Sequence, residues 1–276
     1  MKVYETGNIR NVVVMGHGGC GKTTLVEAIA YQTGITARMG KVTDGNTISD
    51  YDKEEQKRQF SISTSVVPVE FEDIKINFLD TPGYFDFVGE VEEACHAAGA
   101  AVIVINGKSG VEVGTLKAWE LCEKYKLPRL FFVTGMDDDQ ASYRKIVLEL
   151  NDRFGRKVAP FHVPIRENEK FVGFVNVVKM KGRRFINDTS EYEECDIPDY
   201  MDKHLNISRD ALVEAVADTS EELMERYFAG EEFTYEEVST ALRTHVMDCQ
   251  IVPVLVGSGV HNQGTSMLMN VIKKYF

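Results

Sequence analysis

The sequence contains no run of about 18 apolar residues, so it offers no candidate for a membrane-spanning helix. Its first ten residues, MKVYETGNIR, also lack the apolar stretch of a secretory signal peptide. Five cysteines are scattered over 276 residues, and their odd number and irregular spacing argue against a disulfide framework and a cysteine-rich metal site. We therefore expect a cytoplasmic protein with reduced thiols and no contact with membranes.

Basic residues are also in short supply, and the deficit is local. Residues 158–250 hold 10 Lys and Arg against 20 Asp and Glu, a net charge of −10 within a chain total of −12. The remainder holds 21 against 23, a net charge of −2. Such a balance argues against independent nucleic-acid binding and favours a basic protein partner for the acidic segment. We expect the chain to be a monomer.

The first 157 residues alternate short apolar runs with segments of helical periodicity. The expected strands are 11–15, 65–71, 75–79, 100–105 and 129–133, and the expected helices are 22–32, 87–97, 114–125 and 140–154. The runs AAVIVI and RLFFV are apolar throughout, as strands buried on both faces of a parallel sheet are. This alternation predicts a doubly wound, mostly parallel α/β sheet, with 65–71 and 75–79 as an antiparallel hairpin at one edge.

The pattern changes after residue 158. A small hairpin is expected over 171–188 with its turn near Lys181-Gly182, followed by one helix between an N-cap at Ser208 and a stop at Gly230. A second helix should start at about Tyr235. The stretch IVPVLVGSG then reads as a buried strand and GTSMLMNVIKKYF as a closing helix. We therefore expect one domain formed by 1–157 and 251–276, interrupted by an acidic α+β subdomain over 158–250.

A glycine-rich stretch, GHGGCGKT, lies between the first expected strand and the first expected helix. It fits the pattern G-x-x-x-x-G-K-[ST] of the P-loop, in which backbone N–H groups surround nucleotide phosphates. Lys22 would reach the β- and γ-phosphates, and the Thr23 hydroxyl would bind Mg²⁺. A glycine-rich turn that binds nothing is disfavoured by the four glycines and the placement. The predicted phosphate-binding residues are Gly16, His17, Gly18, Gly19, Cys20, Gly21, Lys22, Thr23 and Thr24.

A second motif, DTPG, follows the expected strand 75–79. Asp80 could hold Mg²⁺ through water, while the N–H of Gly83 could bind the γ-phosphate. By itself Asp-x-x-Gly is a common turn. On the next expected parallel strand after the P-loop, it predicts a switch that senses the third phosphate.

The turn Thr134-Gly135-Met136-Asp137 stands where a guanine-binding protein should have Asn-Lys-x-Asp. The Asp137 carboxylate can accept hydrogen bonds from guanine N1–H and the 2-amino group, whereas adenine presents an acceptor at N1. Thr134 is expected to brace this loop less well than Asn, and Gly135 has no side chain to pack on the ribose. Guanine preference should survive with reduced affinity. A backbone N–H of the stretch Ser258, Gly259 and Val260 would bind the base carbonyl.

Together these motifs resemble the GTP-binding domain of translation elongation factor G over essentially the whole chain. The matching stretches are GHGGCGKTTLVEAIAYQTG, GKVTDGNTISDYDKEEQKRQFSIST, DTPGYFDFVGEVEEA, GVEVGTLKAWELCEKYKLPRLFFVTGMD and IVPVLVGSGVHNQG. HVPIRENEKFVGFVNVVKMK and ELMERYFAGEE are similar to the subdomain inserted in that family. The resemblance implies a ribosome-associated GTPase whose acidic insertion contacts the ribosomal stalk, and whose later domains lie outside these residues.

Differences from that family cluster at the nucleotide site, as in the divergent second elongation factor G-like paralogue of some bacteria. The family's Arg-Gly-Ile-Thr is Arg-Gln-Phe-Ser here, its P-loop Ile and Asp are Gly18 and Gly19, and its catalytic His is Tyr84. The resemblance therefore implies Thr23, Ser61 and Asp80 as metal ligands and Lys22, Gly83 and Tyr84 as catalytic residues.

The leading expectation is a GTPase that binds GTP or GDP with Mg²⁺, depends on the ribosome and is weak in isolation. The alternative is a GTP-dependent binding module that changes shape with little or no hydrolysis. Tyr84 is compatible with both, because a phenol can position a water molecule but is a weak base near neutral pH. An ATP-binding P-loop protein is disfavoured by Asp137.

Overall fold

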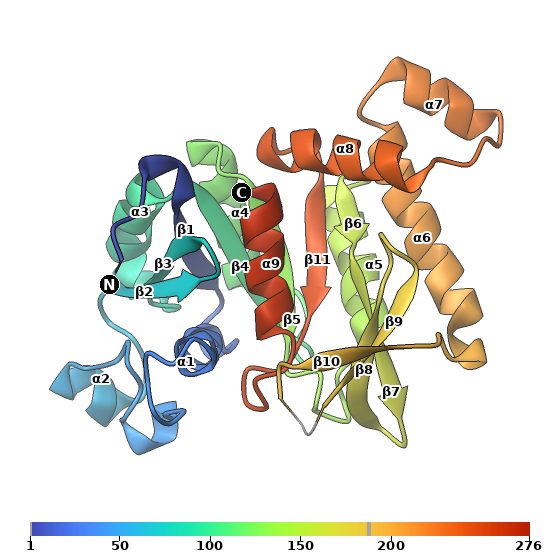
Figure 1. Ribbon diagram of the computed structural model, residues 1–276. Helices are drawn as coiled ribbons and strands as arrows, with labels where there is room; N and C mark the ends of the chain where they lie inside the picture. Colours follow the sequence, from blue (N-terminus) through green and yellow to red (C-terminus); the bar gives the residue numbers. More distant parts are fainter. Residues whose placement is uncertain (1, 187–188) are drawn as a thin grey trace.

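A computed structural model describes residues 2–186 and 189–276, which form a seven-stranded sheet flanked by helices and a smaller four-stranded sheet (Figure 1). The strands are β1 (Ile9–Gly16), β2 (Ser65–Phe71), β3 (Ile74–Asp80), β4 (Ala100–Asn106), β5 (Arg129–Thr134), β6 (Val158–Pro160), β7 (His162–Glu167), β8 (Lys170–Asn176), β9 (Lys181–Phe185), β10 (Tyr192–Cys195) and β11 (Val252–Val256). The helices are α1 (Lys22–Gln32), α2 (Lys53–Arg58), α3 (Val88–Ala97), α4 (Val113–Tyr125), α5 (Tyr143–Phe154), α6 (Asp202–Ala217), α7 (Glu221–Phe228), α8 (Tyr235–Met247) and α9 (Thr265–Tyr275).

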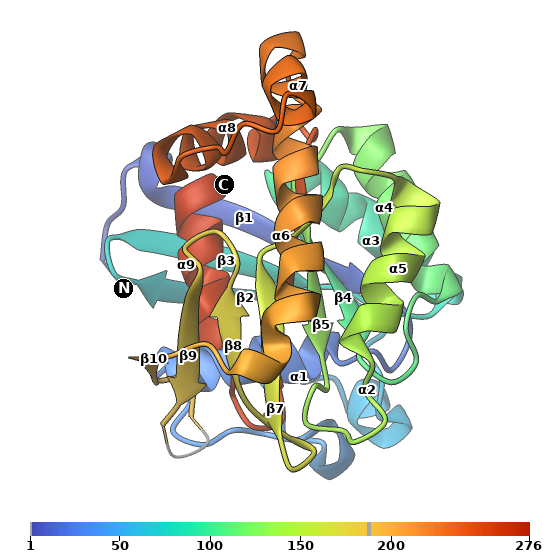
Figure 2. The ribbon, with the colours of Figure 1, turned by 90° about the vertical axis from the view of Figure 1, so that its right-hand side faces the viewer.

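The main sheet has the strand order β2-β3-β1-β4-β5-β11-β6. Only the β2–β3 hairpin is antiparallel, and all other neighbours run parallel. Helices α3, α4 and α5 cover one face and α1 and α9 the other (Figure 2). Strands β5 and β11 are buried along their whole length, which explains their continuous apolar sequence. The predicted doubly wound, mostly parallel fold with an edge hairpin is confirmed.

Strand β1 is the strand at which the order of the connections between parallel strands reverses. It pairs with β3 on one side and with β4 on the other, so the loop after β1 emerges where neighbouring connections diverge. In open α/β sheets this switch point, at the carboxyl ends of the strands, is the place where ligands bind. That edge of the sheet carries the glycine-rich loop, Asp80, Thr134 and the segment after β11.

The segment expected as an insertion contains the second sheet, order β10-β9-β8-β7, and helices α6, α7 and α8. Its first strand, β6, pairs in parallel with β11 and therefore extends the main sheet. The chain leaves the main sheet only after Phe161, whose N–H donates to the Val254 carbonyl at 3.0 Å. None of the described helices has the length and apolar character needed to cross a membrane.

Two local predictions inside this segment are wrong. The hairpin turn lies before Lys181, not at Lys181-Gly182: the Asn176 side chain accepts from the Lys179 N–H at 2.9 Å, and Met180 takes a left-handed φ of 51°. Gly182 lies within β9, and the position requires glycine because a Cβ there would stand 2.6 Å from the Cys195 carbonyl of the neighbouring strand. The far end of the expected hairpin, Asn187 and Asp188, lies outside the described residues.

The single helix expected between Ser208 and Gly230 is two helices. Ser208 lies inside α6, which starts at Asp202 and ends at Ala217. Ser220 then caps α7, and its hydroxyl accepts from the Leu223 N–H at 3.2 Å. The stop at Gly230 is confirmed by its left-handed φ of 77° just after α7, and the helix expected from Tyr235 is α8.

Candidate functional site

The glycine-rich loop joins β1 directly to α1 and leaves the first turn of that helix open. Gly21, the N-cap of α1, has a φ of 101° and provides no side-chain cap, and the first turn carries no acidic residue. Helix N-termini present unpaired N–H groups and the positive end of the helix dipole. The start of α1 is therefore built to receive an anion, and a phosphate group fits it.

The Lys22 ammonium lies in the mouth of this loop. Lys22 is buried, and its Nζ donates to the carbonyl oxygens of Gly16 at 3.2 Å and His17 at 3.0 Å. Gly83 lies against it, because a Cβ on Gly83 would stand 2.5 Å from Lys22 Nζ and 2.7 Å from the Cα of Gly18. Only glycine fits at position 83, so the DTPG turn can approach the loop closely.

His17 and Cys20 direct their side chains away from the loop's concave side. His17 Nδ1 accepts from the Gly114 N–H at 3.2 Å, and its Nε2 lies 3.6 Å from Glu112 Oε1 at the start of α4. Cys20 is buried in the hydrophobic core, and burial raises the pKa of its thiol. The structure thus gives both side chains packing roles, while their backbone atoms form the loop.

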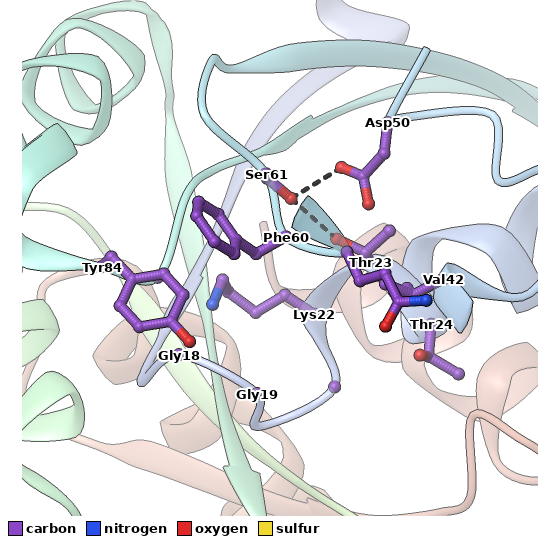
Figure 3. A pocket seen from close by; sticks show the side chains of 13 residues that line it. Gly18, Gly19, Lys22, Thr23, Thr24, Val42, Asp50, Phe60, Ser61 and Tyr84 are labelled. Atoms are coloured by element: carbon purple, nitrogen blue, oxygen red, sulfur yellow. Dashed lines mark hydrogen bonds between the residues drawn. The ribbon is translucent and has the colours of Figure 1, made fainter. Parts of the chain in front are cut away.

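Three expected metal ligands converge beside the loop, and a fourth oxygen donor joins them. Thr23 Oγ1 and Ser61 Oγ lie 3.2 Å apart, and Ser61 donates to Asp50 Oδ1 at 2.7 Å (Figure 3). Asp80 lies at the end of β3 and is buried. Sequence reasoning missed Asp50, because nothing in the acidic stretch SDYDKEEQK distinguishes the carboxylate that lines the pocket from its neighbours.

The electrostatics of these carboxylates fit a divalent cation. Three buried carboxylate oxygens have no hydrogen-bond partner among the described residues: both oxygens of Asp80 and the Oδ2 of Asp50. Burial raises the pKa of Asp80 to about 6 against the opposing charge of Lys22, and burial also raises the pKa of Asp50. Unpaired buried carboxylate oxygens are costly, and hard cations such as Mg²⁺ prefer oxygen ligands.

Tyr84 closes the opposite side of the pocket. Its ring meets Phe60 edge-on with centroids 4.8 Å apart, and it lies over Gly18, where an added Cβ would stand 3.5 Å from the Tyr84 ring. Figure 3 shows Lys22 and Tyr84 entering one pocket from two sides. Tyr84 is half-exposed. An aromatic pair therefore borders the pocket beside Gly18 and Gly83.

The base-reading elements meet at the ends of β5 and β11. Thr134 Oγ1 accepts from the Gly259 N–H at 3.2 Å, so Thr134 braces the neighbouring loop through one hydrogen bond. Asp137 Oδ1 is buried without a hydrogen-bond partner among the described residues, and Asp137 Oδ2 lies 3.7 Å from His261 Nε2. A buried, unsatisfied carboxylate oxygen fits the N1–H and amino donors of guanine.

Most of the predicted residues share this edge of the sheet, with some differences in role. Thr24 also lines the pocket, Ser258 is fully buried, and the side chain of Val260 is exposed and makes no pocket contact. His261, beside Asp137, was not predicted. A lone histidine after Ser-Gly-Val carries no sequence signal, and only the fold places it against the base-reading turn.

The fold and the loop define the chain as a P-loop nucleotide-binding domain. The family described as the elongation factor Tu GTP binding domain matches residues 7–276, and the chain belongs to it. It is a GTPase domain of the translational family, and its nucleotides are GTP and GDP.

A crystal structure of a protein from Thermus thermophilus superposes on it with a TM-score of 0.88 at 35% sequence identity. That match covers 97% of this chain and 40% of the Thermus protein.

Proposed function

We propose that the chain is the GTP-binding domain of a ribosome-associated translational GTPase of the elongation factor G type, acting with Mg²⁺ as a cytoplasmic monomer. The observation that carries the proposal is the grouping of Thr23, Ser61, Asp50 and Asp80 beside Lys22. Two hydroxyls and two carboxylates, three of whose oxygens are unpaired among the described residues, surround the place where a phosphate-bound cation would sit. The inserted segment supports the elongation factor G type.

Hydrolysis would break the bond between the γ-phosphorus and its bridging oxygen while a water oxygen bonds to that phosphorus, giving GDP and phosphate. When bound, Mg²⁺ would neutralise charge on the phosphate oxygens. Lys22 would contact the β- and γ-phosphates, and the Gly83 N–H would bind the γ-phosphate. Tyr84 would position the water through its hydroxyl, but it is a poor proton acceptor near neutral pH.

A second function, a GTP-dependent switch with little hydrolysis, is favoured by the Tyr84–Phe60 pair. The two rings line the pocket together with Lys22 and supply neither an imidazole nor a carboxylate as a base. Single-turnover hydrolysis of GTP by the chain, with and without ribosomes, separates the two functions. We expect negligible turnover alone and an increase with ribosomes. Rapid turnover without ribosomes would contradict the ribosome-dependent function, and no turnover in either condition would favour the switch.

The acidic segment gives a specific surface for the ribosomal contact. On α7, Glu221, Glu222 and Glu225 are exposed beside Phe228, which is 76% exposed. We infer that this helix meets a basic surface of the ribosomal stalk. Replacing the three glutamates by glutamine should weaken ribosome binding and its salt dependence.

The control for the α7 test is Glu191→Gln, which removes one exposed charge outside the helix. The inference predicts a loss for the α7 variant and unchanged binding for Glu191→Gln. Equal binding by both variants, with unchanged salt dependence, would assign the acidic face to solvent.

A further inference from the structure

A second cavity lies far along the chain from the P-loop elements, between the small sheet and the last two helices. Its volume is about 570 Å³. Side chains from β8, β9, α8 and α9 line it, and the ribbon views place α9 alongside the small sheet and beneath α8 (Figures 1 and 2). The lining includes Lys179, Arg183, Arg243 and Lys274 together with Tyr192 and Tyr235.

The four cations have no carboxylate within 4.0 Å among the described residues. The lining's one carboxylate, Glu72, pairs with Lys273 at the rim, so it leaves the other cations uncompensated. This arrangement is unexpected in a chain of net charge −12, and above all within its acidic segment. Like charges repel when they are held together, so the cluster calls for a counter-charge.

Buried side chains form the floor of the cavity. Arg183 is 6% exposed, its guanidinium lies over the Tyr192 ring at 4.4 Å, and Nη1 approaches Met267 Sδ at 3.3 Å. Its Nε has no hydrogen-bond partner among the described residues. His162, 1% exposed, also has both ring nitrogens unpaired within the described part of the chain. Arg183 and His162 therefore place buried polar groups directly beneath the cavity, and Arg183 brings a positive charge to its floor.

The titration behaviour of the lining agrees with a surplus of positive charge. Burial lowers the pKa of Lys274, and the neighbouring charges of Arg243 and Lys179 lower it further against the opposing influence of Tyr235. Burial, followed by the charge of Arg183, lowers the pKa of His162 to about 3, which keeps the imidazole neutral and able to donate one hydrogen bond.

We propose that this cavity binds a small molecule carrying phosphate groups, held by Arg183 at the floor and by Lys179, Arg243 and Lys274 around it. Arginine and lysine are the side chains that recognise phosphate, and tyrosine hydroxyls and rings can hold the remainder of such a ligand. The cations come from β9, α8 and α9 and from the loop after β8. A bound phosphate would therefore link the inserted segment to the last helix of the GTPase domain.

A small ligand explains the geometry better than a nucleic acid does. The volume of the cavity falls in the range of small-molecule sites. An RNA backbone lying across the opening could reach the lysines at the rim, but it would not enter far enough to meet the charge of the buried Arg183. The buried arginine is the feature that selects a ligand able to enter.

The test is calorimetric titration of the chain with inorganic pyrophosphate after saturation with GDP and Mg²⁺, which keeps the probe out of the P-loop. We expect one site with a dissociation constant below about 1 mM, weakened by added salt. Arg243→Gln with Lys274→Gln should weaken binding by about tenfold or more. Lys203→Gln, an exposed cation on α6, is the matched control and should leave it unchanged.

Arg183→Met tests the floor, because it keeps volume and removes the charge. We expect this variant to lose pyrophosphate binding. Its unfolding midpoint without anion should be no lower than that of the original chain, because the substitution removes an unpaired buried charge. Absence of pyrophosphate binding, or unchanged binding in the Arg243/Lys274 variant, would overturn the proposal. So would tighter binding of a ten-nucleotide uridine RNA that survives Arg183→Met, since this would assign the cluster to nucleic acid.

Discussion

Replacing Asp80 by Asn should stabilise the chain when metal and nucleotide are absent, although Asp80 belongs to the nucleotide site. The Asp80 side chain is buried. By hydrogen-bond geometry neither carboxylate oxygen has a partner among the described residues. An ionised group in that position is disfavoured in the folded state. Asparagine has nearly the same shape and no charge, so the substitution removes the electrostatic cost and keeps the packing.

The magnitude follows from the pKa of Asp80, which burial raises from 3.8 to about 6. At about 1.4 kcal/mol for each pH unit, the difference corresponds to about 3 kcal/mol of destabilisation when the group is ionised. Because the folded pKa is the higher one, this cost is present in full above about pH 6. It disappears as the pH falls from about 6 to 3.8, where the carboxyl group is protonated in both states.

The assay is urea unfolding of both chains with a chelator and without nucleotide, at several values between about pH 7.5 and pH 5. The unfolding free energy of Asp80→Asn should exceed that of the original chain by about 3 kcal/mol at the highest pH, and the difference should shrink as the pH falls. Asp44→Asn, which changes an exposed carboxylate at the end of a short 3-10 helix, is the control and should give no such trend. A pH-independent difference between the two chains would refute the reasoning. With GDP and Mg²⁺ the order should reverse, because only the original chain gains the metal contact.

Four further outcomes are expected. Gly135→Lys alone should lower the unfolding free energy by about 1 kcal/mol, because residue 135 has a left-handed φ of 70°, and urea unfolding measures it. Thr134→Asn with Gly135→Lys should then tighten GDP and GTP binding equally and by less than about tenfold, since Thr134 already braces Gly259; calorimetry giving a larger gain would contradict this. Asp137→Asn should reduce the preference for GDP over XDP in the same assay, and an unchanged preference would mean that this turn does not read the base. His162→Gln should reduce the loss of stability as the pH falls below 6.5, because burial lowers the pKa of His162 to about 3 and protonation then favours the unfolded chain.

The main sheet could be predicted because its signals are local and agree with each other. The apolar runs of β4 and β5 and the helical periods between them fix the strand and helix order, and the doubly wound topology follows from known handedness. The inserted segment was harder, because Lys181-Gly182 is a good turn dipeptide that the fold uses inside β9. There the close approach of the Cys195 carbonyl requires glycine, and no local pattern reports a neighbour that far along the chain.

The nucleotide site was predictable where a motif holds it together and not where the fold does. Lys22, Thr23 and Asp80 belong to patterns of fixed spacing at strand ends. Asp50 and His261 belong to none: Asp50 reaches the site because Ser61 donates to it, and His261 because β5 and β11 end side by side. Such residues are brought in by tertiary contacts, which a single sequence does not display.

The departures from the elongation factor G pattern contact one another, and this decides how they should be interpreted. Phe60 and Tyr84 form an edge-on ring pair, and Tyr84 covers Gly18, so three substituted positions make one surface over the phosphate loop. At the base, Thr134 bonds to Gly259, and a Cβ on Gly21 would stand 3.2 Å from the Thr134 methyl group. Neighbouring residues of this kind are energetically coupled. Restoring one family residue, such as histidine at position 84, would leave Phe60 and Gly18 shaped for tyrosine. The altered site is therefore best treated as a repacked one, in which groups of substitutions, rather than single reversions, determine hydrolysis and affinity.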